Sequence, residues 1–273
     1  MNDAPVTAAS VRKDLLAEQA DLDAVVSTLE SAQWELATPS PSWSIRDQIG
    51  HLAYFDRAAA AAIVDVDRFR IMRDELIEHL GDPAGADAAT LSATRAMAPG
   101  ELLEHWRKSR RELADAAATL ADDTRVEWYG PSMGSKSFLT ARLMEAWAHG
   151  QDIADTVGVE RSATDRLRHI AQLGYITRGW TYVNRGLEMP EEAVRVELNA
   201  PSGDTWVWGP AAADSTVRGT ALDFCLVTSQ RRHVADTGLA TQGHAAADWL
   251  EKAQLFAGPP SDPPPPAGHR DQG

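Results

Sequence analysis

Two groups of side chains in this sequence have the types and spacing needed to bind a metal ion. Glu145 and His149 are four residues apart, so on a helix both side chains would lie on one face, about one turn apart. Asp152 follows three residues later on the same face, and His51 lies in an earlier predicted helix. An imidazole with a carboxylate suits zinc, nickel or iron. The chemistry indicated is therefore that of a divalent metal site.

The apolar residues around Glu145 allow a different interpretation. They recur at helical spacing and form one stripe: Leu143, Ala146, Trp147, Gly150, Ile153 and Val157. At about 100° per residue, the centre of that stripe lies roughly 120° around the helix from Glu145, His149 and Asp152. Periodicity by itself therefore favours a solvent-exposed face for these three residues. A lone histidine such as His51 is likewise more often a satisfied or partly exposed side chain than a ligand.

A basic cluster, Arg231-Arg232-His233, follows a predicted helix near the C-terminal end of the chain. Two interpretations are open for its arginines. They can bind a substrate carboxylate, or they can be surface residues that cap the C-terminus of the helix.

Composition restricts the class of protein. The chain has 273 residues, of which 44% are hydrophobic, which is enough for a packed core. A net charge of −14 disfavours nucleic-acid and membrane partners, because it repels phosphate groups. Cys225 is the single cysteine, so no disulfide can form within the chain, and we expect it to be a buried structural thiol. With no signal-peptide pattern in its first ten residues, we expect a cytoplasmic location.

The elements that must position these side chains are mostly helices in the first two thirds of the chain. Apolar spacing predicts a helix around 15–29, which Pro39 and Pro41 bring to an end. Ser44, three residues before Asp47, resembles a capping box at the start of a helix that runs to about residue 80. Further helices are predicted over about 99–120, 137–158 and 162–186, and 81–99 is predicted to be a connection with room for a short helix.

After Pro190 the pattern changes to that of a small α/β unit. Charged and apolar residues alternate over 194–198, which is the period of a half-buried strand. Two more strands are predicted over 206–208 and 215–218, and helices over 220–230 and 246–256. The predicted domains are a helical bundle over 10–186, an α/β domain over 190–258, and a disordered proline-rich tail over 259–273.

Two motifs resemble the mycothiol-dependent maleylpyruvate isomerase family of the DinB-like metal-binding superfamily. The first is Trp43-Ser44-Ile45-Arg46-Asp47-Gln48-Ile49-Gly50-His51-Leu52, and the second runs from Glu145 to Ala154 and contains Glu-x-x-x-His. The resemblance implies a mainly α fold, an antiparallel four-helix bundle followed by a small sterol-carrier-like α/β domain.

For the site, the resemblance implies a divalent metal held by His51, Glu145 and His149. Zinc is the first expectation, with nickel or iron as alternatives, and an open coordination position would accept water or a thiol. It also implies mycothiol as cosubstrate, and an arginine of the C-terminal domain, Arg231 or Arg232, that faces the metal. Asp152 would orient His149 or accept a proton.

The function expected from this resemblance is a metal- and thiol-dependent isomerase or transferase that acts on a small organic acid or electrophile. Two alternatives stay open, a non-catalytic protein that binds a metal or a ligand, and a metal-dependent hydrolase. The expected partners are a small-molecule thiol and a substrate, with a homodimer compatible with the sequence.

Overall fold

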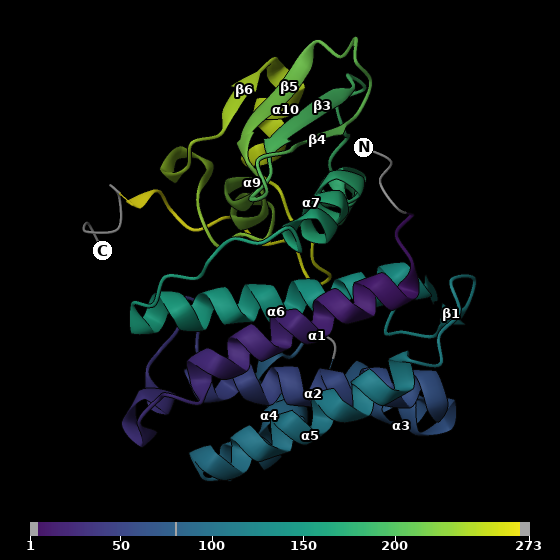
Figure 1. Cartoon of the computed structure of the whole chain (residues 1–273), viewed down its shortest axis with the longest axis vertical. Helices are drawn as coiled ribbons and strands as arrows, with labels where there is room; N and C mark the ends of the chain where they lie inside the picture. Colours follow the sequence, from purple (N-terminus) through teal and green to yellow (C-terminus); the bar gives the residue numbers. More distant parts are fainter. Residues whose placement is uncertain (1–4, 80, 268–273) are drawn as a thin grey trace. The chain divides into compact units, whose positions relative to one another are not determined.

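The chain, described by a computed structural model over residues 5–79 and 81–267, forms two compact units (Figure 1). The first unit ends at Glu160 and the second begins at Arg161. The sequence predicts this boundary later in the chain, between residues 186 and 190. It lies earlier because α7 (Leu167–Ile176) packs against α9 (Ala221–Thr228) of the second unit.

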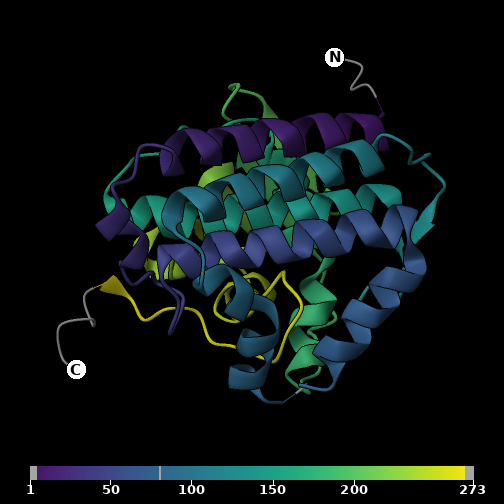
Figure 2. The same ribbon diagram turned by 90° about the horizontal axis from the view of Figure 1, so that it is seen from below.

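Four long helices form the first unit, and Figure 2 shows them side by side. They are α1 (Ala8–Val26), α2 (Ile45–Val64), α5 (Pro99–Ala117) and α6 (Ser135–Val157). Their apolar faces meet in a core whose fully buried members are Leu22, Val26, Trp34, Ile45, Ile49, Leu52, Ala53, Leu102, Trp106 and Ile153. The predicted helical bundle is confirmed, and the hydrophobic effect of this shared core holds it together.

The start of α2 is the predicted capping box. Ser44 Oγ accepts a hydrogen bond from the Asp47 amide at 3.4 Å, and Asp47 Oδ2 accepts one from the Ser44 amide at 3.0 Å. The prediction of one helix from here to about residue 80 is wrong. Asp65 interrupts it with φ −149° and ψ 72°, and caps a separate helix, α3 (Val66–Ile77), by accepting from the Arg68 amide. Residue 80 itself lies outside the described residues.

The connection predicted over 81–99 contains α4 (Pro83–Arg95), which packs against α2. A Cβ atom at Gly50 would lie 2.5 Å from Thr94 Oγ1, so the absence of a side chain permits this close approach. Three short elements complete the unit: the 3-10 helix η1 (Ser31–Glu35) and the antiparallel strands β1 (Arg125–Val126) and β2 (Met133–Gly134).

The second unit contains a four-stranded mixed sheet in the order β4-β3-β5-β6. The strands β3 and β5 are parallel, and the other two pairings are antiparallel. The strands are β3 (Val194–Asn199), β4 (Thr205–Trp208), β5 (Ser215–Thr220) and β6 (Ala240–Gln242), and the remaining helices are α8 (Arg178–Asn184), η2 (Val234–Asp236) and α10 (His244–Leu250). The predicted α/β unit is confirmed, although β6 was not predicted and the helix expected over 162–186 is divided into α7 and α8.

The segment 259–267 differs from the disordered tail that its prolines predict. Ser261 Oγ donates to Gln230 Oε1 at 2.7 Å, and Asp262 forms an ion pair with Arg185 at 2.9 Å. Side-chain hydrogen bonds thus hold a segment that lacks a helix or sheet ladder of its own. Residues 268–273 lie outside the described residues.

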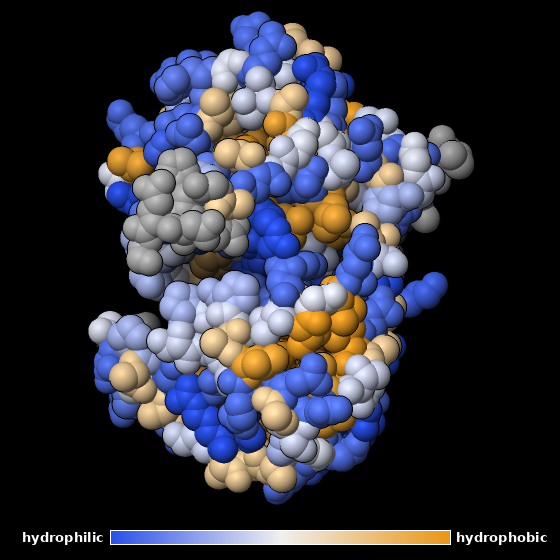
Figure 3. All heavy atoms as spheres, turned by 90° about the vertical axis from the view of Figure 1, so that its left-hand side faces the viewer, coloured by the Kyte–Doolittle hydropathy of each residue, from blue (hydrophilic) through white to orange (hydrophobic). Residues whose placement is uncertain are grey.

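The surface seen in Figure 3 is mostly hydrophilic, with separate hydrophobic patches. Isolated exposed apolar residues are normal on a folded protein. Among the described residues, none of the helices is both long and apolar enough to cross a membrane.

A buried ion pair links three helices of the first unit. Arg142 Nη2 of α6 lies 3.0 Å from Asp56 Oδ1 of α2, and their side chains are only 4% and 1% exposed. Gln19 Nε2 of α1 donates to the other oxygen of Asp56 at 3.0 Å. Burial raises the pKa of Asp56, and the guanidinium of Arg142 offsets part of that rise.

We expect Asp56→Ala to lower the free energy of unfolding by about 3–5 kcal/mol, because it leaves the Arg142 charge buried without its partner. Urea denaturation measures this change. The control is Arg70→Ala, which removes an ion pair to Glu127 whose side chains are 45% and 39% exposed, and which should cost less than about 1 kcal/mol. Equal losses in the two variants would show that the buried ion pair contributes no more to the free energy of unfolding than the exposed one.

Candidate metal centre

Two helices of the first unit supply the three predicted ligands. The capping box at Ser44 starts α2, and His51 lies about two turns into that helix. Glu145 and His149 lie one turn apart on α6. One ligand atom from each of the three residues lies within 4.8 Å of the other two. In the described ranges 5–79 and 81–267, no second cluster of three or more such residues is found.

The three side chains converge on one oxygen atom. Glu145 Oε2 lies 3.2 Å from His51 Nε2 and 3.0 Å from His149 Nε2, and the imidazole centroids are 4.6 Å apart. Each of these atoms carries a lone pair unless it is protonated, so a hydrogen atom or a cation must lie between each nitrogen and the oxygen. A proton can fill that role, and so can a divalent metal ion.

The charge states suit a metal. Burial, and after it the neighbouring His149, lower the pKa of His51 to about 4, and Glu145 opposes the shift. The His51 imidazole is therefore neutral at neutral pH, as a ligand must be. Burial acts to raise the pKa of Glu145, but the hydrogen bonds to His149 and His51 hold it well below its usual range. The donor set combines imidazole nitrogen with an ionised carboxylate, which fits zinc, iron or nickel and leaves coordination positions open.

The burial of this face differs from what helix periodicity by itself favours. The side chains of Glu145, His149 and Asp152 are 25%, 10% and 3% exposed. The apolar stripe of α6 packs into the bundle, yet its polar stripe is also covered, because His51 and Gln48 of α2 lie against it. A helix whose polar and apolar faces are both buried cannot be recognised from its periodicity alone.

Aromatic rings surround the imidazole of His51. The ring of Trp43 lies 4.9 Å from it and that of Phe55 lies 4.6 Å from it. Trp43 also stacks on His149 at 5.8 Å, and its Nε1 donates to both carboxylate oxygens of Asp87 on α4, at 3.1 and 3.2 Å. These rings give the site an apolar wall, which limits the access of water to the ligands.

Sequence reasoning missed Gln48, whose Oε1 accepts a hydrogen bond from His149 Nδ1. Asp152, the residue predicted to orient His149, lies 3.9 Å from that nitrogen, beyond hydrogen-bond distance. Asp152 Oδ2 instead accepts from Gln48 Nε2 at 3.4 Å and from Ser40 Oγ at 3.0 Å. The sequence does offer one indication of Gln48: it precedes His51 by three residues and therefore lies on the same face of the helix.

The two predicted arginines follow α9 in the second unit. The backbone amides of Arg231 and Arg232 donate to the Leu226 carbonyl at 2.8 and 3.2 Å, and Arg231 Nη1 donates to the Ser229 carbonyl at 2.7 Å. These contacts are those of residues that cap a helix C-terminus. Their predicted role in substrate binding stays a prediction.

Cys225 in α9 is fully buried, and its Sγ lies 3.6 Å from the Leu167 carbonyl. Burial raises the pKa of this thiol. Cys225 is therefore poorly suited to act as a thiolate nucleophile.

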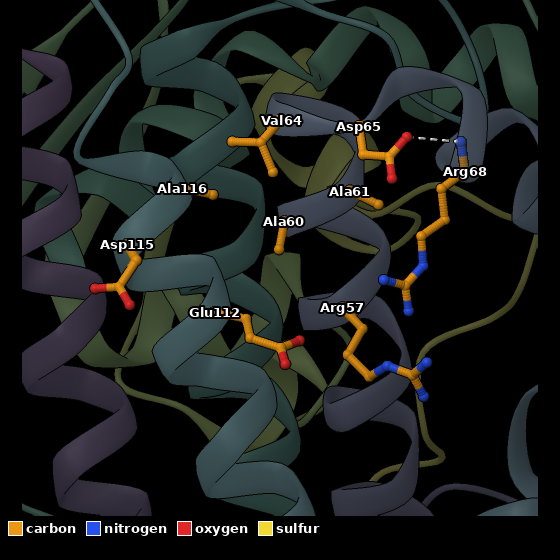
Figure 4. Close-up of a pocket in the computed structure, with 9 residues that line it drawn as sticks. All are labelled: Arg57, Ala60, Ala61, Val64, Asp65, Arg68, Glu112, Asp115 and Ala116. Atoms are coloured by element: carbon orange, nitrogen blue, oxygen red, sulfur yellow. Dashed lines mark hydrogen bonds between the residues drawn. The ribbon is translucent and has the colours of Figure 1, made fainter.

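A surface groove of about 480 Å³ lies elsewhere on the first unit (Figure 4). Its lining comes from α2, α3 and α5 and contains Arg57, Ala60, Ala61, Val64, Asp65, Arg68, Glu112, Asp115 and Ala116. Arg57 follows His51 by six residues, which places it roughly 240° around α2. The groove therefore opens on a different face of that helix and contains none of the three candidate ligands.

Comparisons with known proteins identify the family of the first unit. The family model for the mycothiol maleylpyruvate isomerase N-terminal domain matches residues 15–154, which include all three candidate ligands. Proteins from two strains of Mycobacterium tuberculosis, CDC 1551 / Oshkosh and ATCC 25618 / H37Rv, are each 45% identical over 249 residues. The match covers 90% of this chain and 95% of each relative, both of which are described only as uncharacterized.

Two solved structures share the fold. They are crystal structures of the mycothiol-dependent maleylpyruvate isomerase, one of them of a point mutant, with TM-scores of 0.56 and 0.57. Each is 17% identical to this chain and covers 86% of it and 93% of the solved chain. The architecture, the family model and the two 45% identical relatives lead to one conclusion: the chain belongs to the mycothiol maleylpyruvate isomerase N-terminal domain family, which is DinB-like.

Proposed function

We propose that this protein is a divalent-metal-dependent enzyme that uses a small thiol, mycothiol, to isomerise a small organic acid or to transfer sulfur to a small electrophile. The observation that carries the proposal is the convergence of His51, Glu145 and His149 on a single carboxylate oxygen. Family membership and the solved isomerase structures support the reaction class.

The metal would supply one chemical effect, a lower pKa for a bound thiol, so that thiolate is present near neutral pH. The chain's own residues have complementary tasks. Glu145 contributes the negative charge of the ligand set, and the two histidines contribute neutral nitrogens. The rings of Trp43 and Phe55 limit water around the reacting sulfur, which strengthens electrostatic interactions there.

Two reactions follow from a thiolate held in this way. In the isomerisation, the thiolate sulfur would form a bond to one carbon of an activated alkene while the electron pair of the double bond moves onto the activating carbonyl oxygen. The carbon–carbon bond, now single, would rotate, and return of the electron pair would break the sulfur–carbon bond and release the thiolate. In the transfer, the sulfur–carbon bond forms as a leaving group departs with its electron pair. We propose that Arg231 or Arg232 binds the carboxylate of an acidic substrate.

The ligand assignment predicts the metal content of purified protein. Elemental mass spectrometry should find about one zinc, nickel or iron per chain, and His51→Ala and Glu145→Ala should each lower it at least several-fold. His105→Ala is the matched control, since His105 is also a partly buried histidine on a bundle helix but lies outside the ligand cluster. Unchanged metal content in the two ligand variants would contradict the assignment.

The proposed reaction predicts a double requirement for metal and thiol. With maleylpyruvate and a small alkylating electrophile as probes, conversion should need mycothiol, disappear after chelation and return when zinc is added. His51→Ala should lower the rate at least about 100-fold, because thiolate would no longer be stabilised. Full conversion without any thiol would instead support metal-dependent hydrolysis.

If Arg231 or Arg232 binds the substrate carboxylate, replacing that arginine should weaken substrate binding and leave metal binding unchanged. Arg231→Gln or Arg232→Gln should raise the KM for a carboxylate substrate about 10-fold or more, since a charge-assisted hydrogen bond contributes about 1.5–3 kcal/mol. Metal content should not change in either variant. If neither variant alters the KM, both arginines act only as caps of α9.

A further inference from the structure

Gln48 is fully buried in α2 and connects the loop before that helix to the candidate metal ligands of the first unit. Its Oε1 contacts His149 Nδ1, and its Nε2 donates to Thr38 Oγ1 at 2.8 Å and to Asp152 Oδ2 at 3.4 Å. Every polar atom of this amide therefore has a partner. A buried network in which all members are satisfied can hold its parts in one geometry.

The partners on the amide side can only accept hydrogen bonds from Gln48. Thr38 donates its hydroxyl proton to the Trp43 carbonyl at 2.9 Å, which leaves the oxygen of Thr38 as an acceptor toward Gln48. An ionised Asp152 has no proton to donate, and it also accepts from Ser40. The NH₂ end of Gln48 must therefore face Thr38 and Asp152, and its carbonyl end must face His149.

This orientation decides which nitrogen of His149 carries a proton. A carbonyl oxygen cannot donate, so His149 Nδ1 must carry the hydrogen that Gln48 accepts. In a neutral imidazole, the other nitrogen then has a free lone pair. That nitrogen is Nε2, which lies 3.0 Å from Glu145 Oε2 in the ligand cluster.

We infer that Gln48 is a positioning residue that fixes the tautomer and the ring orientation of His149, so that Nε2 is presented to a divalent cation. The inference deepens the proposed function and rests on it for the cation. The loop residues Thr38 and Ser40 fix Gln48 and Asp152 in turn. Asp152 therefore acts through Gln48 and not directly on the imidazole.

The two candidate histidine ligands are held in different ways. Aromatic rings contact both imidazoles, with Trp43 at 4.9 Å from His51 and 5.8 Å from His149, whereas His149 is in addition hydrogen-bonded to Gln48. Ring packing restricts orientation but does not select a tautomer. A substitution at Gln48 should therefore act on metal binding through His149 and leave His51 in place.

The test compares the zinc affinity of wild-type protein, Gln48→Leu and Gln48→Glu by competition with a chromophoric chelator. Leucine removes the acceptor at similar volume, so we expect an affinity about 10–100-fold weaker. Glutamate keeps an oxygen that accepts a hydrogen bond from His149 Nδ1, so the affinity should stay within a few-fold of wild type. Long-range ¹H–¹⁵N NMR of the histidines at pH 8, with and without zinc, reports the tautomer of His149 directly.

Gln19→Leu is the matched control. Gln19 is also a buried glutamine of the bundle, but it hydrogen-bonds Asp56 and contacts none of the three ligands. It should lower the melting temperature without weakening zinc binding, and circular dichroism should confirm that every variant is folded.

Wild-type affinity in Gln48→Leu, an equal loss in Gln19→Leu, or the absence of a proton on Nδ1 of His149 would each overturn the inference. Wild-type protein that takes up no zinc would overturn the proposed function instead. In that case the tautomer of the metal-free protein still decides whether Gln48 fixes His149.

Discussion

The first unit brings two imidazole nitrogens and one carboxylate oxygen within 4.8 Å of one another, so that each nitrogen and the oxygen need a hydrogen atom or a cation between them. Two helices must meet with their polar faces together to create this arrangement, and burying polar groups without partners is costly. The surrounding residues reduce that cost. Gln48 accepts a hydrogen bond from His149, the rings of Trp43 and Phe55 pack around His51, and Asp87 of α4 accepts a hydrogen bond from Trp43.

A second buried polar contact inside the bundle is an ion pair whose two charges compensate each other without a metal. Asp56 and Arg142 neutralise each other between α2 and α6, the two helices that also carry the ligands. Buried charges are tolerated when they are paired and hydrogen-bonded. The two helices are thus joined by one ion pair and by the His51, Glu145 and His149 cluster, while apolar packing between α2 and α5 forms much of the remaining core.

The architecture and the three candidate ligands could be predicted from the sequence, because capping, apolar spacing and motif resemblance depend on nearby residues. The limits came from features that depend on tertiary structure. Asp65 divides a continuous apolar pattern into two helices, and the polar face of α6 is buried by a helix about a hundred residues away. Gln48 was missed because a glutamine has no sequence signature for its role. That role appears only when Thr38, Asp152 and His149 are seen around it.

The separation of the ligands along the chain has a consequence for biosynthesis. Gln48 and His51 leave the ribosome early, together with the loop that orients the glutamine, whereas Glu145 follows 94 residues after His51. A nascent chain therefore carries a single imidazole from this site, which is too few donors to retain a metal ion. Only after α6 has been made and packed against α2 can the cluster form. A metal ion held by these three residues would therefore be acquired only after α6 has been made.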